Sequence, residues 1–212
     1  MWGFLGRAIG FRTWLLLLAL AVGGLFLGFA LAATDGHFTA PVVDLYLIAQ
    51  YARAMAEGHP FQYNPGDAPS TGATSLLHTA VLALAHAAGA QGEGLIAFAT
   101  LFGGLLYVAS VLRAERLGRL LGDARDARLA AVMVALGGPV VWGFLYGSDS
   151  ALFAFLALWL LERMLREWER PVPWGIAGLG VLLALARPEG LPIALLLGAG
   201  LAWDKRRRAI RP

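Results

Sequence analysis

The sequence predicts an all-α, polytopic membrane protein, and its hydropathy and the pattern of its apolar runs carry that prediction. The 212 residues have a mean hydropathy of +0.66, and only 15% of them are charged. The apolar residues form several long runs that are separated by short charged stretches. Because lipid offers no partner for a backbone N–H or C=O group, such runs are expected to be helices. The chain has no cysteine, which excludes disulfides and thiolate chemistry.

The first predicted span covers residues 13–33, where an apolar run from Trp14 to Ala33 follows Arg7 and Arg12. A cleaved signal peptide is the alternative. We favour an uncleaved span because the run is longer than a typical signal-peptide core and the "AATDG" at its end is a weak cleavage site. Five further spans are predicted within residues 94–203, from apolar runs at 94–112, 128–146, 150–165, 172–187 and 190–203.

The run "SLLHTAVLALAHAA", residues 75–88, is short for a span and favours a helix that lies at the membrane surface. The positions of the Lys and Arg residues help to decide whether this helix crosses the membrane. If 75–88 does not cross, 15 of the 17 Lys and Arg residues fall on one side, and only Arg53 and Arg187 fall on the other. Cytoplasmic segments are enriched in Lys and Arg, so this arrangement predicts six spans with both termini in the cytoplasm. It also explains the net charge of +3 without a nucleic-acid partner.

The predicted organisation is one membrane domain, residues 1–212, with a large external loop at 34–93 and a cytoplasmic tail at 204–212. Surface helices are expected in the loop at about 42–57 and 75–88. Turn residues in "YNPGDAP" join these helices, and Thr74 or Ser75 can cap the second one. Glycines in "GLFLG" and "GGLL" are predicted to allow close helix contacts.

The first surface helix is predicted to have a solvent-facing side, called its wet face below, made of Tyr46, Gln50, Arg53 and Glu57. On the same helical wheel Asp44 falls on the apolar face, where a carboxylate is costly without a partner or a task. The alternative is that Asp44 only stabilises the start of the helix, where an acidic side chain is favourable.

The stretch from Val43 to Leu84 resembles the first periplasmic loop of GT-C-type glycosyltransferases, which include protein O-mannosyltransferases and aminoarabinose transferases. Asp44 matches the second member of an acid pair in that loop, and Tyr46 matches its aromatic residue. Tyr63-Asn64-Pro65-Gly66 matches the "YNPG" turn, and Thr74-Ser75 matches the start of a juxtamembrane helix. The sequence departs from the family pattern at the first acid, which is Val43, and at "PLW", which is Leu76-Leu77-His78.

Two later segments resemble further motifs of this family, in the same order along the chain. "YGSDSALFAFLALWLL" places Asp149 at the family's acidic position, although Ser148 and Asp149 are also good helix N-caps. "LARPEGLPIALLL" contains the family's "RPEG" at Arg187. A guanidinium there can bind a phosphate with paired donors. The alternative is an ion pair between Arg187 and Glu189 that caps a helix break.

The resemblance implies sugar transfer from a polyprenyl-phosphate-linked donor to an unknown acceptor at the outer face of the membrane. In that reading Asp44 is the base and Arg187 binds the donor phosphate. Substrate binding or orientation is expected from Tyr46, Tyr63, Asn64, Asp149 and Glu189. No metal ligand is predicted, although the family leaves a divalent metal possible. The expected partners are the lipid-linked donor and membrane lipids, and the expected location is a bacterial inner membrane.

Two alternatives remain open at this level. A non-enzymatic membrane protein, such as a transporter, a lipid-binding protein or an assembly subunit, could retain the same fold. Members of the family usually have more spans than this chain, so the 212 residues are expected to correspond to the N-terminal part of a longer family fold.

Overall fold

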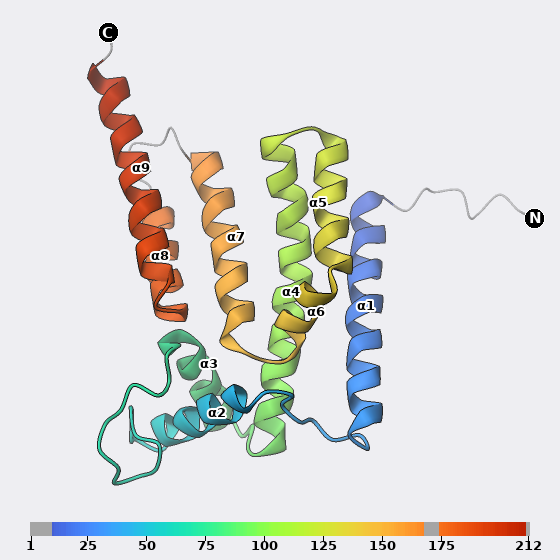
Figure 1. The fold of residues 1–212 in the computed structure, drawn as a ribbon, viewed down its shortest axis with the longest axis vertical. Coiled ribbons are helices and arrows are strands. Elements are labelled where there is room, and N and C mark those ends of the chain that lie inside the picture. Colours follow the sequence, from blue (N-terminus) through green and yellow to red (C-terminus); the bar gives the residue numbers. More distant parts are fainter. Residues whose placement is uncertain (1–9, 168–173, 211–212) are drawn as a thin grey trace, which may run out of the picture.

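The computed structural model describes residues 10–167 and 174–210, with side chains as far as Asp204 (Figure 1). Within these ranges the chain is helical and has no strand, which confirms the all-α prediction. An upright group contains α1 (Phe11–Ala33), α4 (Glu93–Leu121), α5 (Ala124–Leu136), α7 (Asp149–Glu167), α8 (Trp174–Ala186) and α9 (Gly190–Ile210), and the short helix α6 (Gly138–Leu145) continues from α5 at an oblique angle. Two helices lie across one end of this group, α2 (Val43–Ala56) and α3 (Leu76–Ala87).

The upright helices alternate in direction, so the connections fall at two ends of the molecule (Figure 1). We call the end that carries residues 34–92 and the start of α4 the loop end. The opposite end carries the start of α1, the α4–α5 turn and the last turns of α7 and α9. The connections α6–α7 and α8–α9 point back towards the loop end.

Two helices, α1 and α4, are each long and apolar enough to cross a membrane. A third span results if α5 and α6, which meet at a bend of 59°, count as one. These helices support the membrane class but do not establish six spans. The other upright helices fall short of this criterion for different reasons. Helix α7 carries charges such as Glu162 and Arg163, α8 has only 13 residues, and the apolar part of α9, Gly190–Asp204, is also too short.

Helix α4 is longer than the predicted run at 94–112, because it continues through the first charged residues that follow. The reason lies in an ion-pair cluster. Glu115 is fully buried and pairs with Arg12 of α1, at 3.1 Å, and with Arg119 one turn further along α4. A buried carboxylate is tolerated when cations hold it, so the helix need not end at its first charges.

The main core lies among α1 and the helices from α4 to α9, with Tyr107 as its largest fully buried side chain. Gly103 packs directly on α6, where an added Cβ would lie 2.0 Å from the Phe144 carbonyl oxygen. This bears out the predicted close contact for "GGLL". The same prediction was wrong for "GLFLG", because a Cβ on Gly24 or Gly28 would meet no described residue within 4 Å.

A second core joins α2 and α3 to the start of α4, and it includes Leu45, Ile48 and Leu82. The Ser75 hydroxyl accepts a hydrogen bond from the His78 N–H, so Ser75 caps α3 as expected. The buried stripe of α2 is centred on Leu45 and Ile48, which leaves Asp44 exposed at its margin. Placing Asp44 on the buried face was therefore wrong, because Leu45 takes that position.

Candidate functional site

Arg187 lies in the short break between α8 and α9, and the backbone of "RPEG" explains this position. The Arg187 N–H bonds to the Leu183 carbonyl at 3.2 Å, which closes the last turn of α8. Pro188 has no N–H to continue the helix. At Gly190 a Cβ would lie 2.1 Å from the Leu183 oxygen, so only glycine allows this close return of the chain. The break therefore displays Arg187 and Glu189 at the ends of two upright helices.

The Arg187 guanidinium binds three side chains. Its Nη1 donates to the Ser150 hydroxyl at 2.9 Å and lies 3.7 Å from Asp149 Oδ1. Its Nη2 and Nε lie 3.3 and 3.4 Å from the two carboxylate oxygens of Glu189. The ion pair considered as an alternative from the sequence is therefore present, together with contacts to α7. The Arg187 side chain still remains 33% exposed, which leaves part of the guanidinium accessible.

Asp149 is the buried member of this group. It follows Gly147, which has a φ of +82° that favours glycine, and it begins α7. The Ser148 hydroxyl donates to Asp149 Oδ1 at 2.7 Å and accepts from the Ser150 N–H at 3.3 Å. Asp149 is only 6% exposed, so its charge depends on Arg187 and on the Ser148 hydroxyl. Two motifs that lie far apart in the sequence thus form one polar cluster.

Asp44 lies in the first turn of α2, beside the loop that carries this cluster. A Cβ on Gly147 would lie 2.8 Å from Leu45 Cδ2, so α2 packs directly on the backbone before Asp149. Among the described residues, no hydrogen bond or ion pair engages the Asp44 side chain, which is exposed. Its carboxylate is therefore free to accept a proton or a hydrogen bond from a bound molecule.

His78 is a buried residue of α3 that lies close to this loop. Its side chain is 1% exposed, lies in the field of Asp149 and beside the Gly147 backbone, and has no hydrogen-bond partner among the described residues at either nitrogen. Burial lowers the pKa of His78 to about 4, against the opposing effect of Asp149. His78 is therefore a neutral packing residue at neutral pH, in contact with Phe102 through its ring.

Three other predicted substrate residues lie on α2 or in the loop that packs on it. The Tyr46 hydroxyl accepts a bond from the Ala40 N–H at 3.0 Å. Gln50 Nε2 donates to the Tyr63 carbonyl at 2.8 Å and to Asn64 Oδ1 at 3.2 Å. These contacts fasten the "YNPG" turn to the wet face of α2. None of the contacts among the described residues joins Tyr46, Tyr63 or Asn64 to the Arg187 cluster.

Two members of the cluster were missed from the sequence. Ser150 binds Arg187, and the Tyr146 hydroxyl lies 3.3 Å from the Ser150 hydroxyl. No local pattern signals this contact, because Tyr146 follows the end of α6 and Ser150 lies in the first turn of α7, so the turn between the two helices brings them together.

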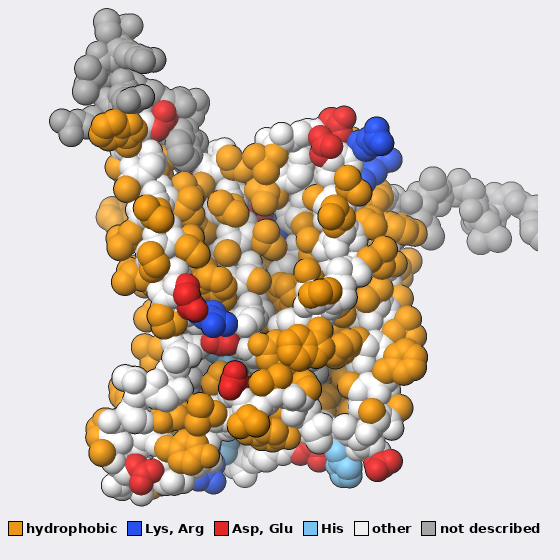
Figure 2. Space-filling model, in the orientation of Figure 1, with side chains coloured by type: hydrophobic (Ala, Val, Ile, Leu, Met, Phe, Trp, Pro, Cys, Tyr) orange, Lys and Arg blue, Asp and Glu red, His pale blue; other side chains and the backbone are white. Residues whose placement is uncertain are grey.

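The cluster combines a guanidinium with carboxylates at the foot of α8 and α9. Figure 2 shows charged side chains grouped there on a face that is otherwise largely apolar. This combination can bind an anionic group that reaches it from an apolar phase. In the part of the chain that the structure describes, no three His, Asp or Glu side chains come together as metal ligands.

Comparisons with family models, with curated proteins and with solved structures gave no match for this chain.

Proposed function

We propose that the chain is a membrane glycosyltransferase, or the N-terminal part of one, that uses a polyprenyl-phosphate-linked sugar. One observation carries the proposal. The partly exposed Arg187 guanidinium sits on an apolar face, and the loop that holds its partner Asp149 packs against the helical turn that bears Asp44. A cation and a free carboxylate at one level of the molecule are the two groups that transfer from a lipid phosphate requires.

In this proposal the Asp44 carboxylate takes the proton of the acceptor hydroxyl as the acceptor oxygen bonds to the anomeric carbon. The bond between that carbon and the donor phosphate oxygen breaks, and its electron pair leaves with the phosphate. Arg187 stabilises the charge on the phosphate, while Asp149 and Glu189 fix the guanidinium in place. Tyr46, Tyr63 and Asn64 shape the water-facing side of α2, where the acceptor approaches.

The proposal includes a membrane arrangement. The upright elements α1, α4, α5–α6, α7, α8 and α9 cross a bacterial inner membrane, and both termini face the cytoplasm. Two observations support it. The axes of the upright helices run side by side in Figure 1, and most of the described Arg side chains belong to segments at the end opposite α2 and α3. The loop end then faces outwards, where it meets the lipid-linked donor.

Asp44→Asn tests the assignment of the base. Transfer of sugar from a labelled polyprenyl-phosphate donor is measured in membranes that contain the full-length protein. General-base catalysis contributes roughly 10²–10⁴-fold, so a loss of that size is expected. Asp35→Asn is the matched control, because Asp35 is an exposed turn residue outside the cluster and Asn tolerates its positive φ of 52°. Unchanged transfer by Asp44→Asn would overturn the base assignment.

A non-enzymatic membrane protein is the second candidate, and one observation favours it. Arg187 already has Asp149, Ser150 and Glu189 as partners, so it has a complete structural role without a ligand. Absence of transfer by the wild-type protein with every donor tried, together with full stability, would favour this second candidate.

A further inference from the structure

A polar cavity lies at the loop end, on the face of α2 that carries Tyr46, Gln50 and Arg53. Its volume is about 510 Å³, which falls in the size range of small-molecule sites, roughly 300–1,000 Å³. Its walls come from α2, from the end of α3, from the first turn of α4, and from residues 37–39, which cross its rim. The charged or titratable side chains that line it are those of His37, Tyr46, Arg53, His86 and Glu93.

Arg53 presents unused donors to this cavity. Its only ion pair within the described chain joins Nε to Glu57 at a long 3.9 Å, and no hydrogen bond to a described residue engages the guanidinium. The His86 ring also approaches Glu57, at 4.0 Å, and its Nδ1 has no partner among the described residues. A guanidinium with free N–H groups is the side chain best suited to bind a carboxylate or a phosphate with paired bonds.

Glu93 supplies the opposite charge from the far wall. The Phe38 N–H donates to its Oε1 at 2.7 Å, and the His37 ring lies 3.1 Å from its Oε2. These contacts fix the carboxylate in place, but its side chain remains 48% exposed. A carboxylate has about four acceptor positions, so Glu93 retains capacity for a further donor.

Arg53 and Glu93 line one cavity without pairing with each other, since no ion pair joins them in the described chain. An anion alone would be repelled by Glu93 and Glu57, and a cation alone would be repelled by Arg53. A ligand with both charges satisfies the two walls together. We infer that this cavity binds a small zwitterion, whose acidic group binds Arg53 and whose ammonium group binds Glu93.

The test uses the full-length protein in detergent, with isothermal titration of unbranched ω-amino acids as probes. Glycine, 4-aminobutyrate and 6-aminohexanoate carry the same two charges at increasing separation. The carboxylate and the amine of matching length each carry only one of them. We expect at least one ω-amino acid to bind at least about tenfold more tightly than either matching single-charge compound, since each charged hydrogen bond contributes that much. Equal binding of the single-charge compounds, or binding of no ω-amino acid, would overturn the inference.

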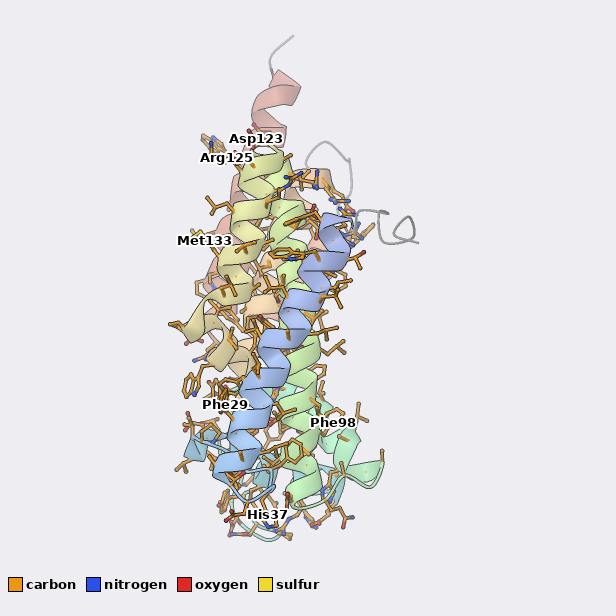
Figure 3. All side chains as sticks on the ribbon, turned by 90° about the vertical axis from the view of Figure 1, so that its right-hand side faces the viewer. Phe29, His37, Phe98, Asp123, Arg125 and Met133 are labelled. Atoms are coloured by element: carbon orange, nitrogen blue, oxygen red, sulfur yellow. The ribbon has the colours of Figure 1, made fainter. Side chains whose placement is uncertain are left out.

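Two variants test whether Arg53 binds the acidic group of the ligand and Glu93 binds its ammonium group. Arg53→Gln should weaken the best probe at least about tenfold and abolish its advantage over the matching amine. Glu93→Gln should also weaken the best probe at least about tenfold and abolish its advantage over the matching carboxylate. Its amide oxygen can still accept the hydrogen bond from the Phe38 N–H. Equal effects of the control variants Arg125→Gln and Asp35→Asn would contradict the assignment. Figure 3 shows Arg125 at the end opposite His37, which lines the cavity.

Circular dichroism and elution volume check that each variant is folded. If Arg53→Gln does not fold, Arg53→Lys replaces it, and the loss of paired donors should still weaken binding of the carboxylate group. The Glu93→Gln result stands independently of both. Tyr46 lines both this cavity and the proposed approach of the sugar acceptor. The inference still does not depend on sugar transfer, because Arg53 and Glu93 have no role in the proposed transfer.

Discussion

Arg187 can both stabilise the fold and bind a ligand. Changing Arg187 together with its buried partner Asp149 distinguishes these two roles. Arg187→Gln leaves the Asp149 carboxylate buried and unpaired, which should destabilise the protein by about 3 kcal/mol. Adding Asp149→Asn removes the unpaired charge and should restore most of the stability. The measurement is the thermal midpoint in detergent, with Arg125→Gln as an exposed control that should change little.

The double variant then discriminates between the candidate functions. If Arg187 binds the donor phosphate, Arg187→Gln/Asp149→Asn is stable but does not transfer sugar. A stable double variant with full transfer would show that Arg187 only supports the fold.

Gly103 and Gly28 look alike in the sequence but differ in their surroundings. An added methyl group at Gly103 meets the Phe144 carbonyl at 2.0 Å, so Gly103→Ala must push α4 and α6 apart. We expect a loss of roughly 1–3 kcal/mol, seen as a lower thermal midpoint. Gly28→Ala enters open space within α1 and should be neutral or slightly stabilising, because alanine favours a helix. A similar loss in both variants would mean that the α4–α6 contact is not tight.

The same comparison shows which features of an element the sequence predicts. The positions of α2 and α3 and the Ser75 cap follow from local signals, because turn residues and caps act within a few positions. The exposure of Asp44 cannot be predicted from local signals, because the residues that pack against Leu45 in the second core decide which face of α2 is buried. The contact of Arg187 with Ser150 joins residues that are 37 positions apart, which no local pattern encodes.

At the scale of the molecule, the open question is which helices cross the membrane, and α3 decides the sidedness of everything after it. Helix α3 has 12 residues, so it is roughly 18 Å long at 1.5 Å per residue, against about 30 Å of hydrocarbon. It also packs against α2 in the second core, and both lie across the end of the upright group (Figure 1). A helix that is too short and lies across the others is expected to remain on one side.

Single cysteines test this directly, because the natural chain has none. Thr71→Cys and Gln91→Cys flank α3, and Ala124→Cys lies at the first residue of α5, next to the α4–α5 turn. All three positions are exposed. In intact cells, an impermeant maleimide should label residues 71 and 91, and residue 124 should react only after the membrane is opened. Labelling of residues 71 and 91 from opposite sides would mean that α3 crosses. The Arg-rich α4–α5 turn would then face outwards, against the charge bias, and the Arg187 cluster would lose its place at the outer surface.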